Sequence, residues 1–311
     1  MNKKLISIIT PTFNEEENVE EVCQQVKAIF NGIPHYDYEH LFIDNASQDN
    51  TVDKLRILAA ADPHIKIIVN QRNFGHVRSP LYGCYQAKGD AIISLVADLQ
   101  DPPSMIVDFI KKWEEGFLVV LGQKEESDES ALMFALRTIY YRVVNKLSET
   151  DLVQHVTGFG LYDRTVMDQI KSLEDPYPYV RGLIAELGYR VARITYKQPQ
   201  RKRGLTKNNF YSLYDCAMLG FTSHSKVPLR LAAMLGFLMS FLSILVATGY
   251  FIYKLLYWHS LPMGIAPMVI GLFLFSSVQL FFIGILGEYI GAIHTQVLHR
   301  PLVIEKERVN F

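Results

Sequence analysis

Two long apolar stretches in tandem dominate the last third of this 311-residue chain. They cover Leu231–Trp258 and Ile265–Ile293, with no charge before Lys254 in the first and none before Glu288 in the second. Each exceeds the roughly 20 residues that a helix needs to cross a bilayer's hydrocarbon core. We therefore expect two transmembrane helices, at about 231–258 and 265–293. The alternative is a buried hairpin of a soluble protein, but helices apolar all round at this length are rare in soluble domains.

Charge around these stretches predicts their orientation. The short link 259–264 has no Lys or Arg, whereas basic residues flank the stretches on the outside, at Lys226, Arg230, Arg300, Lys306 and Arg308. The positive-inside rule then places both flanks in the cytosol. We expect an integral protein of the cell (inner) membrane whose large domain and both termini are cytoplasmic.

Short apolar runs alternate with helical patterns over the first 125 residues. Strands are predicted at Leu5–Thr10, Glu39–Asp44, Lys66–Val69, Ala91–Val96 and Phe117–Leu121. Helices are predicted at Glu15–Phe30, Thr51–Ala61, Val77–Lys88 and Pro103–Glu115. Such alternation predicts βαβ units, and so an α/β, Rossmann-like domain whose mainly parallel sheet has helices on both faces.

These patterns divide the chain into four parts. A soluble domain covers 1–208, with further strands at Thr157–Asp163 and Arg190–Tyr196, and an interfacial amphipathic segment covers 209–230. The two-helix hairpin occupies 231–293, and a cytosolic tail covers 294–311. Within the domain, Ala131–Leu147 predicts an amphipathic helix that either lies on the bilayer or covers the sheet.

Composition and missing motifs exclude several classes of function. The net charge of -1 gives no general attraction to nucleic acid, so no nucleic-acid partner is expected. The sequence has no Gly-x-Gly-x-x-Gly after a strand, no Walker loop and no nucleophile elbow. Nicotinamide-dependent, NTPase and serine-hydrolase chemistry are therefore not expected.

Polar residues follow the predicted strands, where ligands of parallel α/β sheets bind. Asn14 and Glu15 could offer side-chain oxygens and an amide to a base or ribose, although helix capping explains them equally well. Asp44 could accept from a base N–H or a ribose hydroxyl. Farther on, Arg72 could meet a phosphate and Gly75 would permit close backbone approach, while a plain turn explains that segment too.

The segment Asp98-Leu99-Gln100-Asp101-Pro102-Pro103 is the strongest local signal. A carboxylate beside a carboxamide in a proline-stiffened turn offers hard oxygen ligands to Mg²⁺ or Mn²⁺, which bind diphosphates. An Asx turn ahead of a helix is the alternative. We expect a metal-dependent site at Asp98 and Gln100.

Taken in order, these loops resemble those of family 2 glycosyltransferases of the GT-A type. Later segments resemble the polyprenyl-phosphate branch of that family, which includes dolichyl-phosphate mannose synthase and bacterial undecaprenyl-phosphate glycosyltransferases with two C-terminal membrane helices. They are Thr157–Arg164, Arg181–Leu183, Arg201–Lys207, Thr222–Arg230, Leu286–Gly291 and Arg300-Pro301.

The resemblance implies an inverting transfer of one sugar, with UDP-hexose favoured by family habit, to undecaprenyl phosphate or a related lipid at the cytosolic membrane face. The expected residues of the nucleotide-sugar site are Pro11, Asn14, Glu15, Asp44, Ser47, Arg72, Asn73 and Gly75. Asp98 and Gln100 would hold the metal and diphosphate. Arg201, Arg203 and Lys207 would grip the acceptor phosphate, although a basic stretch beside the membrane also attracts anionic lipid. Relatives suggest a homo-oligomer, which the sequence itself leaves open.

The sequence departs from the family pattern at two places. Val96 stands where many relatives have the first acid of Asp-x-Asp, and Gly158-Phe159-Gly160 stands where many have Asp-Phe-Arg. An anionic phosphate acceptor needs little deprotonation, so placement and charge screening would supply most of the acceleration. These departures keep two alternatives open: a glycosyltransferase for another lipid acceptor, and a catalytically inactive scaffold.

Overall fold

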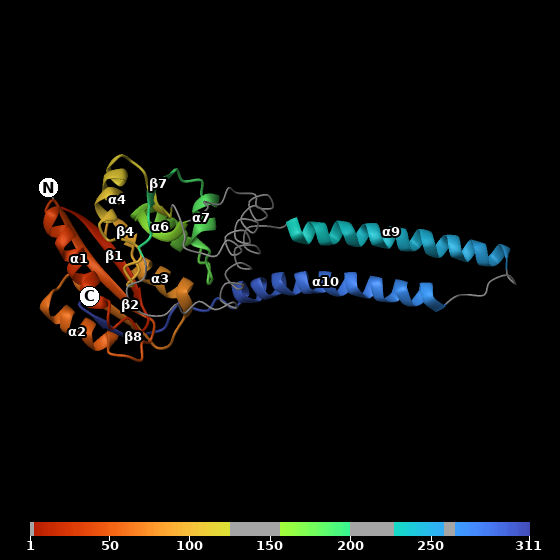
Figure 1. Cartoon of the computed structure of the whole chain (residues 1–311), viewed down its shortest axis with the longest axis horizontal. Helices are drawn as coiled ribbons and strands as arrows, with labels where there is room; N and C mark the ends of the chain where they lie inside the picture. The colour runs from red at the N-terminus through yellow and green to blue at the C-terminus, as the bar shows by residue number, and fades with distance from the viewer. Residues whose placement is uncertain (1–2, 125–155, 200–226, 258–264) are drawn as a thin grey trace.

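The computed structural model describes residues 3–124, 156–199, 227–257 and 265–311. It consists of an α/β domain from which two long helices extend side by side (Figure 1). The predicted helix Ala131–Leu147 and most of the expected interfacial segment 209–230 lie outside the described residues.

One eight-stranded sheet forms the centre of the domain, in the order β7-β5-β6-β4-β1-β2-β3-β8. The strands are β1 (Lys4–Thr12), β2 (Tyr36–Asp44), β3 (Ile65–Asn70), β4 (Ala91–Ser94), β5 (Val119–Lys124), β6 (Val156–Asp163), β7 (Val191–Tyr196) and β8 (Glu305–Val309). Strand pairs β1–β2, β2–β3, β1–β4 and β5–β7 are parallel. β6 runs antiparallel to β4 and β5, and β8 antiparallel to β3. The predicted α/β class with a mostly parallel sheet is confirmed.

Helices connect the strands and cover both faces of the sheet. They are α1 (Val19–Gly32), α2 (Thr51–Ala61), α3 (Gly75–Gln86), α4 (Met105–Glu114), α6 (Arg164–Ser172) and α7 (Val180–Glu186). The first helix begins four residues later than expected from the pattern. Asn14 adopts a left-handed backbone (φ 55°), which breaks helical geometry, and the Glu15 carbonyl first accepts from the N–H groups of Asn18 and Val19.

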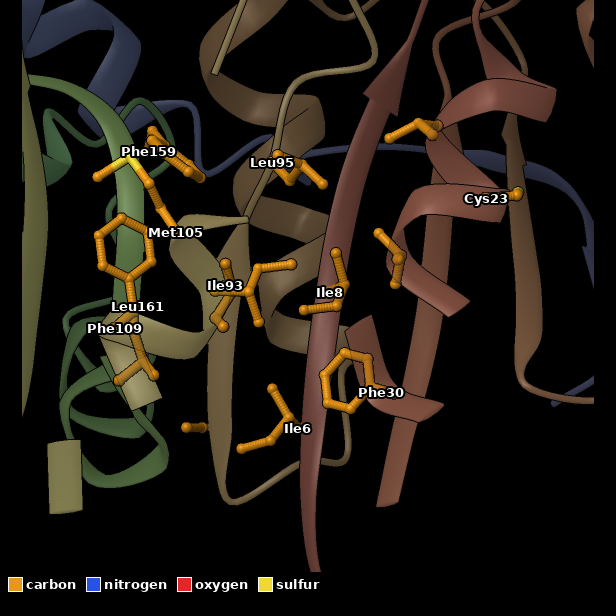
Figure 2. Close-up of a cluster of buried hydrophobic side chains, with 14 of the residues drawn as sticks. Ile6, Ile8, Cys23, Phe30, Ile93, Leu95, Met105, Phe109, Phe159 and Leu161 are labelled. Carbon is orange, nitrogen blue, oxygen red and sulfur yellow. The ribbon is translucent and has the colours of Figure 1, made fainter. Parts of the chain in front are cut away.

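Two apolar layers pack on opposite faces of the central strands. Ile6 and Ile8 of β1 point into the layer that contains Phe109, which Figure 2 shows, while Ile9 points into the other. All four side chains are fully buried. Strands buried on both faces carry continuous apolar runs, which is why the sequence revealed them.

The end of the chain returns to the sheet as β8. The sequence predicts a cytosolic tail without a strand at 294–311, but Ile67 to Asn70 pair with residues 305–309. Arg56 donates to Glu307 at 2.5 Å, and the Asn310 amide donates to the Ala59 and Ile65 carbonyls at 2.7 and 2.9 Å. The segment thus completes one edge of the sheet.

The two long helices are α9 (Val227–Leu256) and α10 (Ile265–Val297). Among the described residues, one segment is long and apolar enough to cross a membrane, Leu274–Val297 of α10, and none of it is buried. The corresponding apolar segment of α9, Ala232–Val246, is shorter. The sequence predicts that both helices cross a membrane, and the described residues show one segment that is long enough and one that is shorter.

Candidate functional site

The loops after β1, β2, β3 and β4 meet along the carboxyl edge of the sheet. Because β4, β1, β2 and β3 are consecutive neighbours in the sheet, these loops succeed one another in space. Three non-glycine residues with left-handed backbone lie in them, namely Asn14 (φ 55°), Ala46 (φ 64°) and Leu99 (φ 57°). Such strain is uncommon and gathers at binding sites.

Hydrogen bonds join the loops after β1 and β2. The Asn14 N–H donates to Ser47 Oγ at 2.8 Å, and Asn14 Oδ1 accepts from the Gln48 N–H at 2.8 Å. The Glu15 N–H donates to Thr51 Oγ1 at 2.9 Å. The predicted residues Asn14, Glu15 and Ser47 are therefore brought together, and both capping and ligand roles remain compatible with their positions.

Asp44 lies at the end of β2, fully buried. Its carboxylate accepts from the Ser47 N–H at 2.9 Å, from Ser47 Oγ at 2.5 Å and from Thr12 Oγ1 at 3.3 Å. Burial raises the pKa of this carboxyl above its ordinary value, although these hydrogen bonds oppose the shift. Pro11, which the sequence analysis placed in the loop, is inside β1 opposite Ile43.

Three asparagines, two of which sequence reasoning missed, connect the loops after β2 and β3. Asn45 Oδ1 accepts from the Phe74 N–H at 2.8 Å and from Asn70 Nδ2 at 3.1 Å, and Asn45 Nδ2 donates to Asn73 Oδ1 at 2.9 Å. Only their position at strand ends could have marked Asn45 and Asn70 in the sequence. Asn73, which was predicted, also accepts from the Gly75 N–H at 2.8 Å.

Gly75 and Arg72 occupy the outer part of the loop after β3. Gly75 has φ +87°, and the space where a side chain would begin is open, so the backbone there is accessible to a ligand. Arg72 is exposed; its guanidinium stacks 4.2 Å from the Phe74 ring centroid and donates to the Asn73 carbonyl at 3.0 Å. Its phosphate contact stays a prediction.

The loop after β4 holds the predicted metal ligands. Asp98 and Gln100 are half-buried, and Asp98 Oδ1 accepts from the Gln100 N–H at 3.1 Å. Asp101 is buried instead and accepts a short hydrogen bond from the Tyr196 hydroxyl. Burial raises the pKa of Asp101, with Tyr196 opposing the shift. Asp101 therefore ties this loop to β7, and the Asp98 and Gln100 side chains are more accessible than that of Asp101.

This donor set fits a metal that takes most of its ligands from a substrate. Across the described residues, no group of three or more His, Cys, Asp or Glu could cage a metal ion. One carboxylate and one carboxamide are hard oxygen donors, and Mg²⁺ is commonly held by one or two carboxylates together with phosphate oxygens and water. Asp98 and Gln100 fit that pattern.

The second of the two departures, at Gly158 and Gly160, is built into the backbone of β6. Gly158 has φ +92°, which L side chains rarely adopt, and a Cβ on Gly160 would lie 2.3 Å from the Val120 carbonyl oxygen. The Gly158 carbonyl accepts from the Tyr162 hydroxyl at 2.9 Å. Neither an acid at 158 nor an arginine at 160 fits this backbone without rearrangement. The expected acceptor residues Arg201, Arg203 and Lys207 lie outside the described residues.

Comparison with known proteins agrees with this geometry. Residues 7–170 match the family model "Glycosyl transferase family 2". The chain is 35% identical to the putative glycosyltransferase CsbB of Bacillus subtilis, over 99% of this chain and 93% of that one. It is 32% identical to the bactoprenol glucosyl transferase of Shigella phage SfV, over 97% and 98%.

A solved structure shares the fold. It is glucosyl-3-phosphoglycerate synthase from Mycobacterium tuberculosis, in complex with Mn²⁺, UDP-glucose and phosphoglyceric acid. The TM-score is 0.50 at 17% identity, and the alignment covers 70% of this chain and 78% of that one. The family match and the full-length relatives lead to one assignment: the chain is a glycosyltransferase that belongs to glycosyl transferase family 2.

Proposed function

We propose that this enzyme transfers one hexose, with inversion, from UDP-hexose to undecaprenyl phosphate or a related polyisoprenyl phosphate at the cytosolic membrane face. The observation that carries the proposal is the attachment of a strand-end nucleotide site to α10, whose apolar segment Leu274–Val297 has no buried part. The phage relative, a bactoprenol glucosyl transferase, is similar over both regions and supports the same lipid and glucose.

The nucleotide sugar lies along the loops after β1, β2 and β3 in this proposal. The nucleoside contacts Pro11, Asn14, Glu15 and Asp44, and the phosphates approach Arg72 and the open backbone at Gly75. Asp98 and Gln100, in the loop after the neighbouring strand β4, would hold Mg²⁺ or Mn²⁺ with the diphosphate. A divalent cation held there would supply positive charge that neutralises the diphosphate leaving group.

The acceptor needs no protein base in this scheme. A phosphate oxygen of the lipid, already anionic near neutral pH, forms the new bond to the anomeric carbon as the bond to the diphosphate breaks. The left-handed glycine backbone at Gly158 leaves that position without a side chain, which is compatible with such an acceptor. Arg201, Arg203 and Lys207 hold the acceptor phosphate, since guanidinium groups suit that task.

Both long helices cross the bilayer in this proposal. α9 has 30 residues and α10 has 33, each enough to span about 30 Å of hydrocarbon at 1.5 Å per residue. Many of the large apolar side chains that the structure describes along both helices are exposed. The cytoplasmic placement of the domain follows from the positive-inside rule. A homo-oligomer stays a prediction.

The test is a lipid-product assay with the full chain purified in detergent. UDP-glucose, UDP-galactose and UDP-N-acetylglucosamine are each supplied with Mg²⁺ and with undecaprenyl phosphate or diacylglycerol, and products are identified by mass spectrometry. We expect a hexosylated polyprenyl phosphate that is lost on chelation of the metal. A diacylglycerol product alone, or no lipid product with any donor, would overturn the proposal.

A further inference from the structure

A basic pocket lies where α10 ends against the domain. It has a volume of about 360 Å³ and is lined by Arg78 of α3, by Pro176 and Tyr177, and by His294, Leu298 and Arg300. The Arg78 guanidinium donates to the Pro301 carbonyl, so the segment after α10 is held against α3. Figure 1 shows α10 leading back to the domain near α3. The pocket is thus built by the domain and the membrane helix together.

Among the residues that the structure describes, no acidic side chain pairs with the two arginines of this pocket. Within the described parts of the chain, neither Arg78 nor Arg300 forms an ion pair, and the buried Nε of Arg78 has no hydrogen-bond partner. Burial lowers the pKa of Arg78, and the positive charges of Arg72 and Arg300 lower it further. Asp175, which precedes the pocket residue Pro176, has other partners: its carboxylate accepts from Gln296 Nε2 at 2.7 Å and from the Tyr177 N–H at 2.9 Å.

Converging cations with an unpaired donor favour binding of an anion. Guanidinium groups bind phosphate through paired N–H donors, and such charge-assisted bonds are about twice as strong as neutral ones. Phosphate is therefore the ligand group that suits this pocket.

The height of the pocket relative to the bilayer identifies the source of the phosphate. The apolar segment of α10 ends at Val297, and His294, Leu298 and Arg300 lie at that end. This is the level of lipid headgroups at the cytosolic face in the proposed orientation. Leu298 and Pro176 add apolar surface beside the charges.

We propose that this pocket binds the phosphate headgroup of an anionic phospholipid and so fixes the catalytic domain on the membrane. The proposal rests on the membrane location in the proposed function. The pocket is separate from the expected metal ligands: Arg78 lies on α3, after β3, whereas Asp98 follows β4, and β1 and β2 separate these strands. At about 4.8 Å per strand, the two loops start roughly 14 Å apart.

Lipid retention by the full chain tests the proposal without any sugar donor. Native mass spectrometry would compare phosphatidylglycerol with phosphatidylcholine for the wild type, for Arg300→Gln and for Arg300→Gln combined with His294→Gln. We expect the wild type to prefer phosphatidylglycerol and Arg300→Gln to weaken its binding roughly ten-fold or more. Arg230→Gln is the matched control, because Arg230 is exposed near the start of α9 and outside the pocket.

Arg78→Lys gives a second, independent variant. It keeps the charge but loses the planar fork, so we expect a smaller loss than in Arg300→Gln with the domain still folded. Thermal unfolding of each variant would identify any loss caused by misfolding.

Three outcomes would overturn the proposal. Equal retention of both phospholipids would exclude headgroup recognition. Displacement of the lipid by inorganic phosphate at low concentration would show a free-anion site. Displacement by undecaprenyl phosphate, with an Arg300→Gln rise in acceptor KM, would show that the pocket holds the acceptor. Because no transfer is measured in the binding experiment, failure of the proposed enzymatic reaction would be seen separately.

Discussion

The domain buries many of its large apolar side chains, whereas the two long helices expose many of theirs. Phe42 and Phe109 are fully buried inside the domain, whereas Phe237 of α9 and Phe281 of α10 are 76% and 66% exposed. Soluble proteins rarely expose contiguous apolar surface of this kind. The difference fits the proposed membrane hairpin, with water around the domain and lipid around the helices.

Polar groups show the same contrast. The domain buries Glu39, which accepts from Lys66 Nζ, Ser7 Oγ and the Lys88 N–H, each at 2.5 Å. Burial alone would raise the pKa of Glu39, but these partners lower it below its ordinary value. A folded domain can provide such partners in its interior, while a lipid-facing helix surface cannot. Substitutions in the two regions should therefore have different consequences.

The largest effect is expected at the chemical site of the domain. Asp98→Ala should reduce sugar transfer by two or more orders of magnitude, because it removes a metal and diphosphate contact. Gln100→Ala should act in the same direction. The measurement is turnover, with donor binding titrated with and without Mn²⁺. Asp108→Ala is the control, since that carboxylate is exposed on α4; unchanged turnover in both site variants would remove the metal assignment.

Replacing phenylalanine by alanine should lower the free energy of unfolding much more in the domain than in the long helices. Phe109→Ala should lower the free energy of unfolding of the domain by about 3–5 kcal/mol, because it leaves a cavity in the core. Phe281→Ala, on the exposed side of α10, should change it by about 0.5 kcal/mol or less. Thermal unfolding of the purified full chain checks both variants. Equal losses would mean that the Phe281 ring is packed against protein.

Replacing an exposed isoleucine by arginine should have the larger effect in the helices and the smaller effect in the domain. Ile283→Arg in α10 should cost about 2.5–3.5 kcal/mol of membrane insertion, as expected for arginine near the centre of a crossing. Ile57→Arg on α2 should stay within about 0.5 kcal/mol, although Ile57 is 71% exposed and Ile283 only 52%. An insertion assay for the helix and unfolding for the domain are the measurements. Normal insertion of Ile283→Arg would argue against a lipid-facing surface.

The smallest expected effect is a pH dependence confined to the domain. His40 is buried with Nε2 2.9 Å from Thr10 Oγ1, and burial lowers its pKa from 6.5 to about 3. Below pH 6.5 the unfolded chain takes up a proton that the folded domain does not. Stability from this group should therefore be present above pH 6.5 and fall by about 2 kcal/mol at pH 5. His40→Gln should flatten the dependence, while His35→Gln, at an exposed site, should keep it.

Much of the sheet could be predicted because its central strands are buried on both faces and so are continuously apolar. β8 could not, because the sequence Glu305–Val309 alternates half-buried and exposed residues and is mostly charged. Charges are common on edge strands, where they discourage pairing with other chains. Only pairing with the neighbouring strand β3, in which Ile67 lies opposite Val309, makes this segment a strand.

The site divides in a similar way. Its acidic and amide residues could be predicted from their place after strands, and the family from the order of those loops. The partners that position these residues could not be predicted. The hydrogen bonds of Asn70 to Asn45 and of Tyr196 to Asp101 depend on which strands become neighbours. Sequence spacing contains no such information before the sheet order is known.

The position of β8 also constrains how the protein is made. Translation produces α9 and α10 before β8, so the ribosome delivers both anchoring helices while one edge of the sheet is still bare. If both helices insert as proposed, the domain receives its final strand only once the chain has come back from the bilayer. Until then the edge of β3 is unpaired, and an unpaired edge strand can pair with other chains.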